Sequence, residues 1–291
     1  MSEPIRLDPR PHPSSLRWQS QTVLLLFLPI AAVWVTMEAG QFWYAQDAAL
    51  FLGAAISVAL AALVLITRAA TPAAAFTGAI FAAALWLQTP GLHTALWPLL
   101  ALLLLTFSAT RFGRRRKETL GTAEARRGRT ASQVAANLGV AALAGIPLSA
   151  AHVFTPLAFG GRAAMVAMIA AMAEATADTV SSELGQVVGG PPRLIINFRR
   201  VPAGTDGAIS LNGTLLGSLA AAVLVAVAAL ALPSFSRADA LIALSAGIAG
   251  LFFDSLLGAV PERHGWLNND AVNALSTFAA ALLAAWSVRF F

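Results

Sequence analysis

Four acidic residues lie within or next to long apolar stretches of this chain: Glu174, Asp178, Glu183 and Asp254. A charged side chain inside a bilayer costs about 3 kcal/mol on insertion scales, so an intramembrane acid usually belongs to a functional site. Carboxylate oxygens are also ligands that Mg²⁺ prefers. The acids therefore predict either an enzyme that handles phosphates with Mg²⁺ at a membrane surface or the ionisable site of a transporter.

A basic segment precedes the acids in the sequence. It runs from 111 to 129 and holds eight of the 19 Lys and Arg residues. Arginine binds phosphate oxygens through a fork of N–H groups, which suits a loop that clamps polyphosphate. The alternative is a solvated cytoplasmic loop that binds anionic lipid headgroups. That alternative does not account for the embedded Gly113, Gly121 and Gly128 or for the two glutamates of the segment.

The composition excludes a soluble globular protein. The chain has 291 residues, of which 58% are hydrophobic and 11% charged, and its mean hydropathy is +0.72. The basic residues flank apolar runs, so they do not indicate nucleic-acid binding. The absence of cysteine excludes disulfides and thiolate sites.

Apolar runs of roughly 20 residues can each cross a bilayer as one helix. We place nine such spans, separated by Pro and Gly breakers. They lie near 22–37, 48–67, 72–89, 93–109, 132–150, 161–181, 208–232, 238–259 and 272–290. The sequence therefore predicts an all-α polytopic membrane helix bundle of about nine transmembrane helices.

The distribution of basic residues predicts a cytoplasmic N-terminus, because Lys and Arg favour the cytoplasmic side. In that orientation, all but Arg162, Arg237 and Arg289 of the 19 basic residues are cytoplasmic. We interpret the first span as uncleaved rather than as a signal peptide. The regions are then a cytoplasmic tail at 1–21, four helices within 22–109, a basic cytoplasmic loop at 110–130 and a five-helix core at 131–291.

Three of the polar residues near the sixth span recur every four residues: Glu174, Asp178 and Ser182. They share one stripe of a helix. Glu183 lies about 140° around an ideal helix from Asp178, so it joins the same site only if the helix loosens before Gly185. The alternative is a hydrogen-bonded polar seam between helices.

Three further features leave alternatives open. Thr205 or Asp206 could cap the next helix, whose N–H groups would then bind an anion, or the region could only be a cap followed by a Gly213–Gly217 packing motif. Asp254 shares a helix face with several glycines, which favours a metal ligand over a paired or neutral acid. Asn268, Asn269 and Asp270 could cap the last helix or bind nucleotide or metal.

In this topology five polar features reach the cytoplasmic face. They are the basic segment, the end of the sixth span with Asp178 and Glu183, the loop at 185–207, Asp254 and the Asn268–Asp270 motif. Transporters more often place ionisable groups near the midplane, on broken helices of related halves. The convergence favours an enzyme.

Five blocks, at 114–121, 175–185, 204–207, 254–258 and 269–273, resemble the integral membrane family that contains transmembrane protein 19 and the phytyl-phosphate kinases of chloroplasts and cyanobacteria. The resemblance covers roughly 100–291. It implies phosphoryl transfer from a nucleoside triphosphate, with CTP favoured, to an isoprenyl monophosphate such as phytyl or geranylgeranyl phosphate. Val180 stands where tryptophan is expected in that family.

Under this resemblance the expected roles are these. Asp178, Glu183 and Asp254 would hold Mg²⁺ and act in catalysis with Lys117, whereas Glu174 is left open. Arg114, Arg115, Arg116 and Lys117 would grip the phosphates. Thr205, Asp206 and Gly207 would shape the nucleotide pocket, with Asn269, Asp270 and Asn273 nearby. The prenyl tail would lie among the apolar spans, as a phosphoryl-transfer enzyme mainly has to position and neutralise its substrates.

Several other functions share these features. A lipid cytidylyltransferase or polyprenol kinase would use the same acids with another acceptor, a transporter would not consume nucleotide, and a scaffold would tolerate loss of the acids. The expected partners are nucleoside triphosphate, an isoprenyl monophosphate and membrane lipids, but no nucleic acid. A homodimer is left open. The expected location is the bacterial inner membrane, with the active site facing the cytoplasm.

Overall fold

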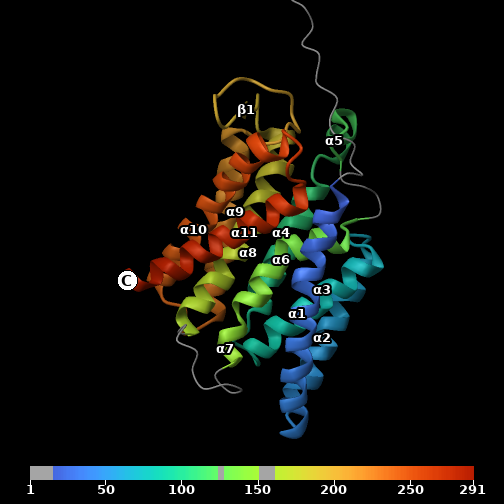
Figure 1. Cartoon of the computed structure of the whole chain (residues 1–291), viewed down its shortest axis with the longest axis vertical. Helices are drawn as coiled ribbons and strands as arrows, with labels where there is room; N and C mark the ends of the chain where they lie inside the picture. The colour runs from blue at the N-terminus through green and yellow to red at the C-terminus, as the bar shows by residue number, and fades with distance from the viewer. Residues whose placement is uncertain (1–15, 124–127, 151–160) are drawn as a thin grey trace, which may run out of the picture.

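The computed structural model describes residues 16–123, 128–150 and 161–291, and nearly all regular structure there is helical (Figure 1). The helices are α1 (Arg17–Tyr44), α2 (Ala48–Ile66), α3 (Pro72–Gln88), α4 (Leu96–Arg111), α5 (Arg114–Leu120), α6 (Ala131–Ala144), α7 (Ile146–Ala150), α8 (Gly161–Val188), α9 (Leu211–Ala231), α10 (Arg237–Leu257) and α11 (Asn269–Ser287). Strands β1 (Arg193–Leu194) and β2 (Ala208–Ile209) pair antiparallel. The turns η1 (Gly258–Glu262) and η2 (Val288–Phe290) follow α10 and α11.

The predicted polytopic helix bundle is confirmed. Within the described ranges, seven helices are long and apolar enough to cross a membrane, and α4 with α5 forms an eighth candidate bent by 60°. The third predicted span is α3, a shorter apolar helix of 17 residues. Residues 1–15 of the predicted tail, and Glu124, Arg126 and Arg127 of the basic segment, lie outside the described residues.

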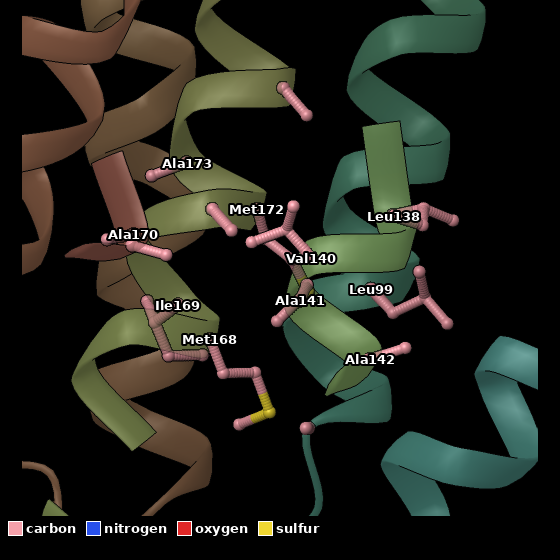
Figure 2. Close-up of a cluster of buried hydrophobic side chains, with 14 of the residues drawn as sticks. Leu99, Leu138, Val140, Ala141, Ala142, Met168, Ile169, Ala170, Met172 and Ala173 are labelled. Carbon is pink, nitrogen blue, oxygen red and sulfur yellow. The ribbon is translucent and has the colours of Figure 1, made fainter. Parts of the chain in front are cut away.

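Helix α8 is the centre of the bundle. It packs against α4, α6, α9, α10 and α11. In its most apolar stretch of 18 residues, 83% of the residues are buried. A helix segment that is apolar on all sides belongs inside a bundle, and residues 163–173 of α8 are all Ala, Met, Val or Ile. Figure 2 shows part of this core, with Met168, Ile169 and Met172 of α8 and Val140 and Ala141 of α6.

Glycines allow α9 and α10 to approach α8 closely. A Cβ atom at Gly217 would lie 2.5 Å from the Ala177 carbonyl oxygen, and one at Gly250 would lie 2.5 Å from Cγ of Glu174. Such distances leave no room for a side chain, as at close helix crossings in membranes. The structure therefore places the glycine faces around Gly213–Gly217 and Gly247–Gly250 at contacts within one chain.

The loop before α9 differs from the expectation that Thr205 or Asp206 would cap the helix. Strand β2 intervenes, so the cap is Ser210, whose hydroxyl accepts a hydrogen bond from the Gly213 N–H at 3.2 Å. Thr205 instead donates from its hydroxyl to the Pro202 carbonyl at 2.8 Å. The expected anion site at the helix N-terminus therefore does not involve these two side chains as caps.

Several connections meet at the end of the bundle that carries α5, called here the α5 end (Figure 1, top). Gly204 of the β1–β2 loop packs against Thr122 after α5, and Gly207 packs against Ala259 of η1. The Asn268 side chain before α11 donates to the Leu16 carbonyl at 2.8 Å, ahead of α1. The α1–α2 connection and α7 lie at the opposite end (Figure 1).

We expect Gly217→Val to separate α8 from α9 and to destabilise the protein by about 1–3 kcal/mol, because a branched side chain would overlap the backbone of α8. Thermal unfolding of purified protein in detergent measures the effect. Ala226→Val, on an exposed position of the same helix, is the matched control and should unfold at the wild-type temperature. Equal unfolding temperatures for both variants would contradict the close α8–α9 contact.

Candidate functional site

Two carboxyls from different helices meet near the α5 end. Asp178 of α8 and Asp254 of α10 interact directly through their side chains, and both are half-buried. The Ser276 hydroxyl of α11 donates to Oδ2 of Asp254 at 3.1 Å. Two ionised carboxylates at such close range repel each other, so the arrangement favours a cation or a shared proton between them.

Glu174 adjoins this pair, one turn earlier on α8. Its side chain is 1% exposed, and Oε1 accepts no hydrogen bond from the described residues. Its carboxyl contacts Ser276 and lies near Asp178. A buried oxygen without a donor is costly. Glu174, Asp178, Asp254 and Ser276 are called here the acid cluster.

Glu183 does not complete a three-carboxylate metal site with Asp178 and Asp254. The described residues contain no group of three or more His, Asp or Glu side chains arranged to hold a metal ion. The physical reason is that α8 stays helical to Val188, so Glu183 remains turned about 140° from Asp178. The expected loosening before Gly185 does not occur.

Lys117 takes a different place from the one expected. Its side chain is 1% exposed, and its ammonium forms an ion pair with Glu183. It also donates to the carbonyls of Ala109 at 2.8 Å and Thr110 at 3.0 Å, near the end of α4. All three ammonium protons are engaged, so Lys117 presents no donor to a phosphate in this conformation. It instead fixes the bend between α4 and α5 against α8.

The three arginines of α5 lie at the surface. Arg114 is half-buried and pairs with Glu118 at 3.1 Å, and Arg115 and Arg116 are exposed. An exposed pair of this kind contributes little stability, so binding a phosphate in its place costs little. Gly113, in the left-handed region at φ +62°, begins α5 and turns it away from α4.

Arg129 is the residue that sequence reasoning missed as a site member. Its backbone pairs with the α2–α3 connection, through Arg129 N–H to Ala69 at 2.9 Å and Thr71 N–H to Arg129 at 3.0 Å. Its guanidinium donates to Thr179 Oγ1 at 3.4 Å and lies beside the Asp178 carboxyl. The last arginine of the basic segment thus reaches the acid cluster, and its position directly before a span was the available signal.

The predicted nucleotide residues form two groups at the α5 end. Thr205, Asp206 and Gly207 lie in the β1–β2 loop, where a Cβ atom at Gly207 would come within 2.2 Å of Ala259 N. Gly207 also adopts φ +70°. Glycine is therefore favoured here both by the left-handed backbone conformation and by the lack of room for a Cβ atom against η1. The loop therefore lies directly on the segment that follows Asp254.

The second group begins α11. Asn269 is exposed, Asp270 is buried and Asn273 is half-buried. Asn268 supplies the cap by accepting from the Ala271 N–H at 2.9 Å. The Ser276 hydroxyl, one turn further along α11, lies 3.1 Å from both Oδ2 of Asp254 and the Asn273 carbonyl oxygen, and it can donate its proton to either. The N-terminal part of α11 therefore contributes to the acid cluster.

Comparison with known proteins shows the family of the chain. Residues 55–281 match the family described as integral membrane protein DUF92. The chain belongs to this family. The match confirms the family resemblance that the five sequence blocks indicated. The chain is accordingly an integral, multi-pass membrane protein. No solved structure matches it.

Three relatives illustrate the reach of the DUF92 family. The chain is 42% identical over 125 residues to an uncharacterized membrane protein of Methanocaldococcus jannaschii, covering 43% of this chain and 52% of the relative. It is 31% identical over 182 residues to an uncharacterized membrane protein of Synechocystis, and the match covers 61% of this chain and 67% of the relative. It is 32% identical over 184 residues to the chloroplastic protein VTE6 of Arabidopsis thaliana, and the match covers 61% of this chain and 53% of VTE6. The matches thus span about half to two thirds of these relatives.

We expect Lys117→Met to lower the stability of the protein by about 3–5 kcal/mol, because it leaves Glu183 without its partner. The double variant Lys117→Met with Glu183→Leu should recover much of the loss, since it removes both charges. Thermal unfolding in detergent compares the two. An unchanged unfolding temperature for Lys117→Met, together with a raised KM for nucleotide, would instead return Lys117 to the phosphate-binding role.

Proposed function

We propose that this protein is a membrane-embedded kinase that transfers a phosphoryl group from a nucleoside triphosphate, CTP favoured, to an isoprenyl monophosphate such as phytyl or geranylgeranyl phosphate. The observation that carries the proposal is the position of Arg129. Its guanidinium donates to Thr179 and lies beside Asp178, which brings the basic segment against the acid cluster. Membership of the DUF92 family and the similarity to VTE6 support it.

In the proposed reaction, an oxygen of the acceptor phosphate attacks the γ-phosphorus of the nucleotide. The bond from that phosphorus to the β–γ bridging oxygen breaks, and its electron pair stays on the oxygen of the departing nucleoside diphosphate. The product is the isoprenyl diphosphate. A phosphate acceptor is already ionised near neutral pH, so the reaction needs positioning and charge neutralisation more than a general base.

Asp178 and Asp254 are the proposed Mg²⁺ ligands. Their paired oxygens fit an ion that takes one or two carboxylates together with phosphates and waters. When bound, Mg²⁺ would neutralise charge on the transferring phosphoryl group. Ser276 orients the Asp254 carboxylate, and Glu183 acts indirectly, by holding Lys117 at the base of α5.

The basic segment and the two groups at the α5 end would bind the nucleotide. Arg114, Arg115 and Arg116 project from a short helix whose base is fixed by Lys117, so their forks can meet phosphate oxygens. The β1–β2 loop with Thr205–Gly207 and the first turn of α11 with Asn269, Asp270 and Asn273 flank the same end. We propose that these two segments hold the base and ribose.

The orientation completes the proposal. Nucleoside triphosphates are cytoplasmic, so the α5 end would face the cytoplasm of a bacterial inner membrane, with the N-terminus on the same side. The positive-inside rule favours this orientation, because α5 and Arg68 lie at this end.

The orientation is testable because the chain contains no cysteine. We expect Thr119→Cys, on the exposed side of α5, to react with a membrane-impermeant maleimide in inside-out vesicles only. Ala45→Cys, in the exposed α1–α2 connection, should react in right-side-out vesicles only. The reverse pattern would place the site outside the cytoplasm.

We expect purified wild-type protein, given Mg²⁺ and each of CTP, ATP, GTP and UTP, to convert phytyl, geranylgeranyl or farnesyl monophosphate to the diphosphate. Asp178→Asn and Asp254→Asn should each reduce this transfer by about 100-fold or more. Both should remain folded, because each substitution removes a repulsion between adjacent acids. Product analysis and thermal unfolding measure the two effects.

The control is Asp47→Asn, which keeps a helix cap at the opposite end of the bundle and should transfer at the wild-type rate. Full activity in Asp178→Asn or Asp254→Asn would remove the metal assignment. Release of pyrophosphate with a cytidylyl lipid would identify a cytidylyltransferase, and phosphorylation of a prenol would identify a polyprenol kinase. Substrate movement without nucleotide consumption would identify a transporter.

A further inference from the structure

A cavity of about 230 Å³ lies between α2 and α4. Helix α2 packs mainly on α3, whereas α4 packs mainly on α8 and α9, so the two helices stand apart and leave a groove. Its walls are leucine-rich, with Leu60 and Leu63 from α2 and Leu103 and Leu104 from α4. The α3 floor consists of small residues such as Gly78 and Ala79, which leave width for a branched chain.

One end of this groove is cationic. Arg68, Arg111, Arg114 and Arg129 all line it, and no Asp or Glu does so among the described residues. The Arg111 guanidinium lies over the Phe107 ring at 4.5 Å from its centroid and donates to the Thr67 carbonyl. A long apolar groove with four arginines at its mouth is complementary to a lipid with a small, highly charged anionic head.

Arg129 connects the mouth of the groove to the acid cluster. It lines the groove, donates to Thr179 and lies beside Asp178. A phosphate held at the mouth would therefore sit next to the acids that we propose to bind Mg²⁺. Arg129 therefore links the groove to the acid cluster, and Arg114, a predicted phosphate-binding residue, lines the same mouth. The apolar walls come from α2, α3, α4 and α6, which carry none of the predicted site residues.

We propose that this groove binds the isoprenyl chain of a single-chain lipid monophosphate, with the phosphate held by Arg68, Arg111, Arg114 and Arg129. This inference rests on the proposed function and assigns the acceptor half of the site. A phosphate monoester carries nearly two negative charges at neutral pH, whereas the diester of a phospholipid carries one. The single groove and four arginines therefore favour a monophosphate with one chain over a membrane phospholipid.

The first test is photolabelling of the purified full chain with geranylgeranyl monophosphate that carries a diazirine near the end of the chain. We expect labelled peptides from α2, α3, α4 and α6, whose Val134, Asn137 and Leu138 also line the groove. Unlabelled geranylgeranyl monophosphate should compete, but geranylgeraniol and phosphatidylglycerol should not. Labelling of other helices would overturn the inference. Equal competition by phosphatidylglycerol would also overturn it, since the groove would then be a general lipid site.

Two variants fill the groove from different walls. Ala79→Phe narrows the floor, and Leu104→Trp narrows it from α4, where the native side chain is 56% exposed and overpacking is not expected. Each should abolish competed labelling. Ala62→Phe, on an exposed position of α2 that does not line the groove, is the control and should label as the wild type does. Labelling that survives in both filled variants would overturn the inference.

Kinetics separate this inference from the proposed function. In the filled variants, kcat/KM for geranylgeranyl phosphate relative to dimethylallyl phosphate should fall by about tenfold or more, because only the long chain needs the groove. An unchanged ratio in a protein that makes diphosphate would overturn the groove and leave the kinase standing. Competed labelling of the groove helices α2, α3, α4 and α6 in a protein that makes no diphosphate would support the groove and reject the kinase.

Discussion

The burial of acidic side chains on α8 is the constraint on which the rest of the structure depends. A carboxylate in a low-dielectric interior must be given a donor, a cation or a proton, and a helix surrounded by other helices can obtain these only from its neighbours. Lys117 forms an ion pair with Glu183. Arg129 and the Asp254 carboxyl lie beside Asp178. Ser276 contacts the Glu174 carboxyl. The basic segment, α10 and α11 are therefore held where the acids need them.

Close packing makes this possible. The glycines of α9 and α10 bring these helices against the backbone of α8, so short side chains such as Asp254 and Ser276 can reach the acids. Larger residues at these crossings would hold the helices apart and leave the carboxyls without partners. The small residues at these helix crossings are therefore what allows the acid cluster to form.

The two halves of the chain then contribute different chemistry. Helices α8, α10 and α11 carry the acid cluster. Helix α5 and the β1–β2 loop lie at the proposed phosphate side, and α2, α3, α4 and α6 form an apolar groove with a cationic mouth. The five sequence blocks start at 114 and so describe only the phosphate side, whereas the family match begins at 55 and includes the groove helices. Many apolar sequences can hold a lipid chain, so the proposed lipid groove does not require a residue motif in that half.

The sequence by itself determined the features that depend on local order. Hydropathy placed every described helix of membrane length, because a span must be apolar along its own 20 or so residues, and the four-residue spacing put Glu174 and Asp178 on one stripe. Only the tertiary structure decided which groups meet: Lys117 with Glu183 and the carbonyls at the end of α4, Arg129 with Asp178, and Ser210 rather than Thr205 as a cap. Partners of this kind are chosen by distance in space, and a sequence pattern carries no such distance. The groove depends most fully on the tertiary structure, because it forms only where α2 and α4 pack on different neighbouring helices.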